Sequence, residues 1–135
     1  MKKQSGETEI KFRYRIKDTF NGKIEFRYLT LNQIEGGLVF NNIGLKHEVL
    51  SRDQFTGRSD KNRKDIYESD IVIAKYNGSF RAPVVYDRGS FKLDCGRDIR
   101  NRPYILLEDW CQENAKTIVV IGNIHENPEM LREIK

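Results

Sequence analysis

The sequence has 135 residues, a formal net charge of +4, and 33% charged against 38% hydrophobic residues. A chain of this length can bury a core without cross-links, and its spread of aromatic and β-branched residues argues against disorder. No apolar run approaches the roughly 20 residues that cross a bilayer, and the polar residues after Met1 do not form a secretory signal. Cys95 and Cys111 are the two cysteines. We therefore expect a soluble protein of a reducing cytoplasm, with free thiols and no membrane contact.

Residues 9–28 alternate between apolar and charged side chains, with Asn21-Gly22 between the two halves. A period of two is typical of half-buried strands, and Asn-Gly favours a tight hairpin turn. We expect Tyr14, Phe26 and Tyr28 on the core side of this hairpin. Its solvent face then either contacts phosphates or keeps the sheet soluble, and placing the aromatics in the core favours the second interpretation. The charged side chains of that face are Arg13, Arg15, Lys23, Glu25 and Arg27.

The segment after the hairpin gives weaker signals. Gly36-Gly37 interrupts any helix, residues 38–40 form a candidate buried strand, and residues 41–44 contain turn-forming asparagine and glycine. We group these residues with the hairpin as an N-terminal region over residues 1–47.

The stretch from Gln54 to Val72 gives the most specific pattern in the chain. An extended segment anchored by Phe55 leads into a polar loop over residues 57–65, and an apolar strand begins at Ile71. Asp70 is expected to cap the turn before that strand. The loop alternates basic and acidic residues, and its basic members are Arg58, Lys61, Arg63 and Lys64.

The remaining residues predict an antiparallel meander. Asn77-Gly78 and Arg88-Gly89 are turn signals between apolar, β-rich runs. We expect a second polar loop over residues 94–103, which carries Arg97 and Arg100, then a helical turn over residues 108–112 and a buried strand over residues 117–121. Asn127-Pro128-Glu129 predicts the start of a short C-terminal helix, because Asn suits the cap and Pro the first position.

Several of these motifs together resemble the YopX family of small proteins encoded by phages and prophages. The matching residues lie between about Leu50 and Leu131 and comprise Gln54-Phe55-Thr56-Gly57, Asp60-Lys61-Asn62, Ile66-Tyr67-Glu68, Asp70-Ile71-Val72, Val84-Val85-Tyr86, Gly89, Phe91 and Val120–Glu129. The resemblance implies a cytoplasmic protein of a bacterial host and is consistent with an oligomer. The family usually has glycine at the positions of Arg63 and Ser69 and an apolar residue at that of Arg58. Arg63 and Ser69 must therefore either accept left-handed backbone or form a different turn.

Catalytic chemistry has little support in the sequence. His47 has no second histidine or cysteine nearby at metal-binding spacing. His125, beside Glu126 in the C-terminal family block, is either a general base or a structural residue, and the structural role is favoured because other members of the family tolerate a different residue there. Neither cysteine belongs to a motif that includes a histidine. The acidic residues around the central loop do not follow the spacing of a calcium loop. We expect no enzyme activity, no metal and no cofactor.

These observations predict a mainly β protein with the N-terminal hairpin region at residues 1–47. A small, partly open antiparallel β-barrel with a short C-terminal helix would follow at residues 48–135. The expected function is an oligomeric interaction module for a host or phage protein, and nucleic-acid binding is the alternative. The candidate binding residues are Arg58, Lys61, Arg63, Lys64, Arg97 and Arg100, and the motif residues assigned to the fold are Phe55, Gly57, Ile66, Tyr67, Glu68 and Asp70.

Overall fold

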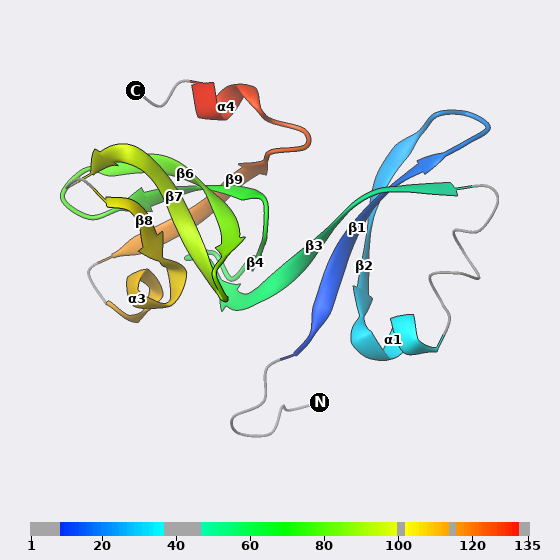
Figure 1. Ribbon diagram of the computed structural model, residues 1–135, viewed down its shortest axis with the longest axis horizontal. Coiled ribbons are helices and arrows are strands. Elements are labelled where there is room, and N and C mark those ends of the chain that lie inside the picture. Colours follow the sequence, from blue (N-terminus) through cyan, green and yellow to red (C-terminus); the bar gives the residue numbers. More distant parts are fainter. Residues whose placement is uncertain (1–8, 37–46, 100–101, 114–115, 133–135) are drawn as a thin grey trace. The chain divides into compact units, whose positions relative to one another are not determined.

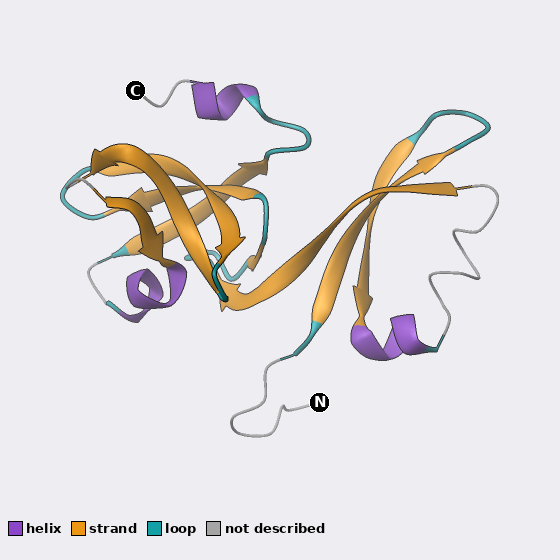
Figure 2. Ribbon diagram, in the orientation of Figure 1, coloured by secondary structure: helices purple, strands orange, loops and turns teal. Residues whose placement is uncertain are grey.

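The computed structural model describes residues 9–36, 47–99, 102–113 and 116–132. The chain divides into two compact units, residues 1–57 and residues 58–135, and each is described by itself. Strands dominate both units (Figure 2). The expected division at residues 47 and 48 stays a prediction. The strand expected at residues 38–40 and the turn at residues 41–44 lie outside the described residues.

The first unit is built on an antiparallel hairpin. Strand β1 (Lys11–Asp18) pairs with β2 (Ile24–Thr30), and β1 also pairs with β3 (His47–Ser59). The sheet order is β2-β1-β3-β4, where β4 is the short strand Asp65–Tyr67 (Figure 1). In the turn, Asp18 Oδ1 accepts hydrogen bonds from two backbone N–H groups, and Gly22 has a φ of 76°. The predicted hairpin is confirmed.

The side chains on the two faces of this hairpin are not those that the sequence predicts. Arg13 lies opposite Tyr28, and Arg15 lies opposite Phe26, so these aromatics share a face with the arginines. Tyr14 lies on the other face, opposite Arg27. Tyr28 is 56% exposed. The prediction that Tyr14, Phe26 and Tyr28 share one core side is therefore wrong.

Arg13 was expected on a solvent face, but it is only 5% exposed. Its Nη2 donates to Asp53 Oδ2 at 3.0 Å, and its guanidinium carbon lies 5.1 Å from the centre of the Phe26 ring. Because Arg13 and Asp53 are cross-strand partners on β1 and β3, this buried ion pair joins the two strands.

The opposite face of the sheet holds a small apolar cluster. Tyr14, Ile16 and Leu29 are buried there, and Phe12 and Ile34 pack against them. Ile34 belongs to the short helix α1 (Leu31–Glu35), which follows β2 directly. A capping box between Thr30 and Gln33 starts this helix.

The second unit contains a five-stranded antiparallel sheet with the order β8-β7-β6-β5-β9 (Figure 1). The predicted meander, the helical turn after it and the strand over residues 117–121 are confirmed. Its elements are β5 (Asp70–Lys75), β6 (Ser79–Asp87), β7 (Ser90–Ile99), β8 (Arg102–Leu106), α3 (Leu107–Gln112), β9 (Thr117–Asn123) and α4 (Glu129–Arg132).

A mainly β fold is confirmed, with two open sheets and three short helices in the described parts of the chain. The described strands do not close into a barrel. The polar loop expected over residues 94–103 is wrong, because β7 continues to Ile99 and β8 begins at Arg102.

The core of the second unit lies on one face of its sheet. Helix α3 contributes Leu107 and Trp110 to this core, and Trp110 contacts Phe80 edge-on at 5.5 Å. Trp110 Nε1 also donates to the backbone oxygen of Thr117 at 3.0 Å, so the polar atom of the ring is satisfied. The buried members are Ile66, Val72, Ala74, Ala82, Val84, Leu93, Cys95, Leu107, Trp110 and Ile118.

The predicted C-terminal helix is confirmed as α4. The side chain of Asn127, the predicted cap of this helix, forms a hydrogen bond with the end of β9. Asn127 Oδ1 accepts a hydrogen bond from the backbone N–H of Asn123 at the end of β9. A Cβ atom on Gly122 would lie 2.5 Å from Asn127 Oδ1, so any other residue there would displace the Asn127 side chain from this position.

Candidate functional site

The basic loop of the central motif is organised by one carboxylate, that of Asp60. We call residues 60–64 the Asp60 loop. Asp60 is 7% exposed, and its Oδ1 accepts hydrogen bonds from the backbone N–H groups of Asn62 and Lys64 at 2.8 and 2.9 Å. The backbone N–H of Asp60 donates to the oxygen of Lys64 at 2.8 Å. The sequence Asp-x-x-x-Lys therefore closes on itself as a tight loop.

The same loop is bonded to strand β9. Asp60 Oδ2 accepts from the backbone N–H of Val120 at 2.9 Å, and the backbone N–H of Lys61 donates to the oxygen of Ile118 at 2.9 Å. Strand β9 is an edge of the five-stranded sheet, so Ile118 and Val120 would otherwise present these groups to solvent. The Asp60 loop covers this edge against pairing with another strand.

Three basic side chains project from this fixed loop. Lys61, Arg63 and Lys64 are all exposed. Arg63 has a φ of 66° and Ser69 has a φ of 75°, so both residues adopt the left-handed backbone that glycine accommodates most readily. Of the two alternatives for these positions, the structure shows the first.

Arg58 lies on strand β3 and not in the loop where the sequence placed it. Its Nε donates to Glu108 Oε1 of helix α3 at 2.9 Å, and its Nη2 bonds the other carboxylate oxygen. Gln112 Nε2 donates to the same carboxylate at 2.7 Å. The hydrogen bond with Glu108 raises the pKa of Arg58, and the bond from Arg58 lowers the pKa of Glu108. Arg58 therefore ties β3 to α3 within the second unit.

The turn after the loop is held by a second buried carboxylate. Asp70 Oδ2 accepts from the backbone N–H of Tyr67 at 2.8 Å, and Asp70 is almost fully buried. Ser69 donates its N–H to the oxygen of Val84 and accepts from the N–H of Ile124. Ile66 and Tyr67 are buried beside this turn. Glu68 is half-buried in the same turn.

The other two motif residues lie on β3 in the first unit. Phe55 is buried, and the Lys11 ammonium lies 4.5 Å from the centre of its ring. Gly57 has a φ of 89°, a conformation that favours glycine.

The structure describes no contact between the Asp60 loop and the other two candidate binding residues, Arg97 and Arg100. Arg97 lies within strand β7, where no side-chain position is described, and Arg100 lies outside the described residues. The binding role of these arginines stays a prediction.

The two thiols are poor nucleophiles. Burial, with a smaller effect from the Asp94 charge, raises the pKa of Cys95 to about 11. Burial also raises the pKa of Cys111. Both cysteines are free. A thiol must be ionised to attack, so these shifts oppose nucleophilic chemistry at neutral pH.

The described residues contain no group of three His, Cys, Asp or Glu side chains placed to hold a metal ion. In the same residues, no helix is long and apolar enough to cross a membrane.

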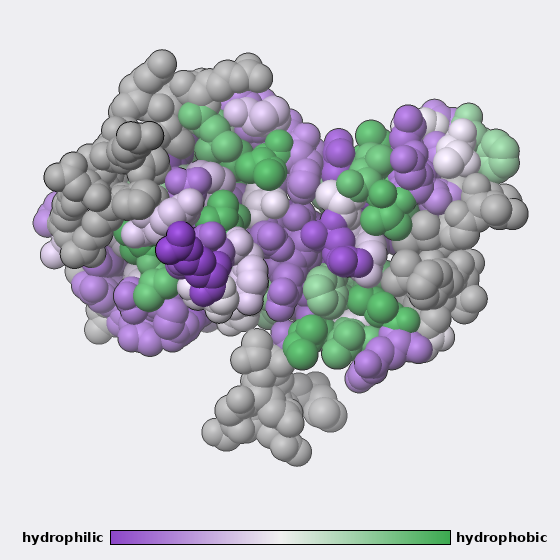
Figure 3. Space-filling view, viewed as in Figure 1, coloured by the Kyte–Doolittle hydropathy of each residue, from purple (hydrophilic) through white to green (hydrophobic). Residues whose placement is uncertain are grey.

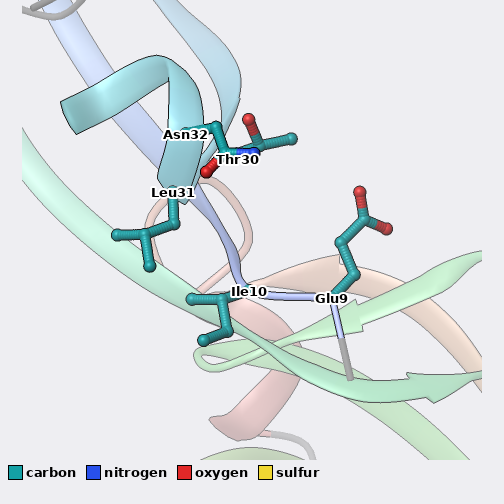
Figure 4. Close-up of a pocket in the computed structure, with 5 residues that line it drawn as sticks. All are labelled: Glu9, Ile10, Thr30, Leu31 and Asn32. Carbon is teal, nitrogen blue, oxygen red and sulfur yellow. The ribbon is translucent and has the colours of Figure 1, made fainter. Parts of the chain in front are cut away.

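A shallow hollow of about 300 Å³ lies where the hairpin meets α1. Figure 4 shows Ile10 and Leu31 extending to the same side, with the Glu9 carboxylate pointing away from them. Thr30 and Asn32 complete the lining. One carboxylate beside two aliphatic side chains provides no convergent acid, base or nucleophile, so this hollow is not a candidate active site.

The feature that sequence reasoning missed is the outer edge of strand β2. Lys23 and Leu31 form the backbone hydrogen bonds to Asp18 and Ile10 at the two ends of the hairpin. Hydrogen-bonded pairs alternate in an antiparallel ladder, so the odd-numbered residues of β2 bond to β1 and the even-numbered ones point outward. The amide of Thr30 supports this assignment, because it donates to the Gln33 side chain and not to β1.

Exposed apolar side chains accompany this edge. Phe20 in the turn is 80% exposed, and Ile24 in β2 is 41% exposed. Tyr28 is also exposed on the same strand. Apolar side chains reach the surface of the molecule in several separate patches among hydrophilic ones (Figure 3). The alternation of residues 23–28 could have identified this edge once the turn length was known.

The fold and the loop define a mainly β protein of two compact units, in which a carboxylate-centred loop covers one sheet edge. The chain belongs to the YopX family, whose model, described as YopX protein, matches residues 7–132. Among solved structures, the chain is similar to protein EF1440 from Enterococcus faecalis, at 22% identity and a TM-score of 0.46. That match covers 89% of this chain and 97% of the other. Among curated proteins, none matches this sequence.

Proposed function

We propose that this YopX-family chain is a non-enzymatic interaction module of a phage or prophage, which acts as an oligomer in the bacterial cytoplasm. The observation that carries the proposal is the outer edge of β2, which ends the four-stranded sheet in the part of the chain that the structure describes and bears exposed Ile24 and Tyr28. An edge strand with apolar side chains is a template for pairing with another chain. Its partner is a second copy or a host or phage protein.

The composition of β2 supports an interface more than a solvated surface. The strand Ile24–Thr30 contains no proline and no lysine, the residues that commonly prevent edge pairing. Aromatic residues and arginine, both enriched in protein interfaces, alternate along it as Phe26, Arg27 and Tyr28.

A non-catalytic role is supported by how the buried ionisable groups are used. The carboxylates of Asp60 and Asp70 accept backbone hydrogen bonds that hold turns, and the Cys95 thiol is kept neutral by burial. Groups engaged in this way are structural supports and are not positioned to transfer protons.

The mass of the purified protein in solution tests the proposal. Light scattering over a range of concentrations should give a mass that rises above the 15.9 kDa of one chain. A mass of one chain at every concentration, together with no partner recovered in a pull-down from host cells, would contradict it. The matched pull-down control is Ile24→Lys, which places a charge on the proposed edge and should lose any partner that binds there.

Nucleic-acid binding is the second candidate, favoured by the Asp60 loop. Lys61, Arg63 and Lys64 are exposed on a backbone held by several hydrogen bonds, so three cations are presented with little ordering cost. Phosphate binding by these cations would make affinity fall steeply with salt.

A fluorescence titration with single- and double-stranded oligonucleotides at two salt concentrations tests this candidate. Neutralising Lys61, Arg63 and Lys64 with glutamine should reduce the slope of log affinity against log salt by about 2 to 3. Arg88→Gln removes one exposed cation from a different turn and serves as the control. No binding at low salt would exclude the candidate.

A further inference from the structure

We infer that strand β2 pairs antiparallel with β2 of a second copy of this chain, about a two-fold axis through Phe26. The inference rests on the proposed function and names its partner and its register. It follows from the direction of the backbone groups, from the order of side chains along β2, and from the charges of Glu25 and Arg27.

The backbone geometry permits this pairing. The even-numbered residues Ile24, Phe26 and Tyr28 direct their N–H and C=O groups away from β1. With Phe26 on the axis, Phe26 faces itself, and Ile24 faces Tyr28 of the second copy. All of these are outward-pointing residues on both copies, so each facing pair can exchange two hydrogen bonds.

The side chains are self-complementary in this register. Glu25 lies opposite Arg27 of the second copy, and the two-fold axis repeats this ion pair. Because residues 25 and 27 point their backbone groups toward β1, they form a non-hydrogen-bonded pair across the axis, in which side chains approach closely. On the other face, Ile24 packs against Tyr28 of the second copy, an aliphatic–aromatic pair that favours strand association.

The neighbouring registers are electrostatically unfavourable. An axis through Glu25 also matches outward-pointing residues, but it places Glu25 opposite Glu25. An axis through Arg27 places Arg27 opposite Arg27. Like charges directly opposite one another destabilise a strand pair, so the order Ile-Glu-Phe-Arg-Tyr selects the axis at Phe26.

In a single chain the two charged groups already pair with each other. Arg27 Nε lies 3.3 Å from Glu25 Oε2, and both side chains remain partly exposed. Association would exchange this contact in each of the two chains for two contacts between the copies. The dimer therefore holds as many Glu25–Arg27 ion pairs as the two separate chains.

Charge reversal tests the inference by sedimentation analysis across a concentration series. Glu25→Arg and Arg27→Glu each place like charges opposite one another at two symmetric positions, and each should raise the dissociation constant of the dimer at least about tenfold. The double variant Glu25→Arg with Arg27→Glu restores opposite charges in every pair. It should recover the association of the original sequence.

Lys23→Glu is the matched control, because it reverses an exposed charge in the same hairpin and faces Leu29 in the proposed register. It should leave the association unchanged. Circular dichroism of each variant checks that the fold is intact, and the recovery in the double variant also excludes misfolding as the cause.

The outcomes separate this inference from the proposed function. An oligomer that is weakened by each single reversal and restored by the double one supports both. An oligomer unaffected by the single reversals overturns the β2 pairing and leaves the oligomeric function in place. A chain that stays at one-chain mass up to millimolar concentration overturns the β2 pairing, and it overturns the proposed function as well when the pull-down from host cells recovers no partner.

Discussion

Two sheet edges of this protein, those of β9 and β2, differ in whether a neighbouring loop bonds to their outward backbone groups. Strand β9 in the second unit has its edge groups at Ile118 and Val120 bonded by the Asp60 loop. Among the described strands, β2 ends the sheet of the first unit, and its Ile24 and Tyr28 side chains are exposed. An apolar edge that is covered preserves the monomer fold, and one that is left open is suited to association.

The comparison also shows two different ways of controlling what pairs with an edge. At β9, the control is backbone bonding from a neighbouring loop, which is insensitive to the partner's sequence. At β2, the control is the order of charges, because Glu25 and Arg27 accept only a strand that presents the opposite order. The family motif around Asp60 therefore has a structural role, while β2 carries the specificity that we propose.

Removing the cover from β9 should have the largest effect. Asp60→Ala deletes the acceptor of three backbone N–H groups and should lower the free energy of unfolding by about 3 kcal/mol. The uncovered edge should also make the variant self-associate at protein concentrations where the original does not. Urea unfolding and light scattering measure the two effects.

Asn62→Ala is the control for that experiment, since its exposed side chain lies in the same loop and leaves the Asp60 contacts in place. It should change the free energy of unfolding by less than about 0.5 kcal/mol. An Asp60→Ala variant as stable as this control would contradict the role assigned to the carboxylate.

A proline on β2 should prevent hydrogen bonding at the outer edge of this strand. Ile24→Pro removes an outward N–H and leaves the bonds between β2 and β1 intact. Since two hydrogen bonds per dimer are lost, the dissociation constant should rise roughly ten- to a hundredfold, with little change in monomer stability.

Glu25→Pro, one residue further along β2, tests which residues of the strand direct their backbone N–H groups outward and which direct them toward β1. Its N–H points toward β1, so this proline should destabilise the hairpin by about 3 kcal/mol. Equal effects of the two prolines on monomer stability, measured by thermal unfolding, would show that the assignment of outward residues is wrong.

A glycine in place of Arg63 should stabilise the Asp60 loop. Arg63 holds a left-handed φ of 66°, which costs a residue with a Cβ about 1 kcal/mol relative to glycine. Arg63→Gly should therefore raise the free energy of unfolding by up to about 1 kcal/mol, seen as an increase in Tm. Arg81→Gly, in strand β6, should instead lower the Tm, because that residue does not need a positive φ.

The smallest expected effect concerns the Arg58–Glu108 pair. The folded-state pKa of Glu108 is lowered by Arg58, so the pair stabilises the fold above the ordinary pKa of a glutamate and is lost as the pH falls through the lowered value. Because Glu108 is exposed, Glu108→Gln should cost about 0.5 kcal/mol at pH 7. The difference between variant and original should disappear at strongly acidic pH, and a difference that persists there would contradict this account.

Much of the local structure could be predicted from sequence. The alternation over residues 9–28 and the glycine turns at Gly22, Gly78 and Gly89 give the hairpins, because positive φ is needed at each of these glycines. The Asp70 turn could also be recognised, since an aspartate before a strand readily accepts a backbone N–H.

The cross-strand register could not be predicted in the same way. Alternation gives each strand two faces, but the length of the turn decides which faces coincide. Asp18 bonds Lys23 across a turn of residues 19–22, which places Arg13 opposite Tyr28 and reverses the expected assignment. A turn one residue longer would have placed Tyr14 opposite Tyr28, and a turn one residue shorter would have placed it opposite Phe26.

The long-range bonds of the candidate site were also outside the reach of sequence. Asp60 and Val120 are separated by 60 positions, and Arg58 and Glu108 by 50. Nothing local to the loop reveals that its carboxylate reaches an edge strand, so the sequence alone presents its charges as a binding surface.

Hydrogen exchange at the amides of β2 tests the central claim most directly. The amides of Ile24 and Phe26 should exchange rapidly in dilute protein and slow down as the concentration rises, because association covers the outward edge. The amides of Glu25 and Arg27, which bond to β1, should be slow at every concentration. Rapid exchange of Ile24 and Phe26 at all concentrations, or slow exchange at all concentrations, would contradict an open edge that pairs with a second copy.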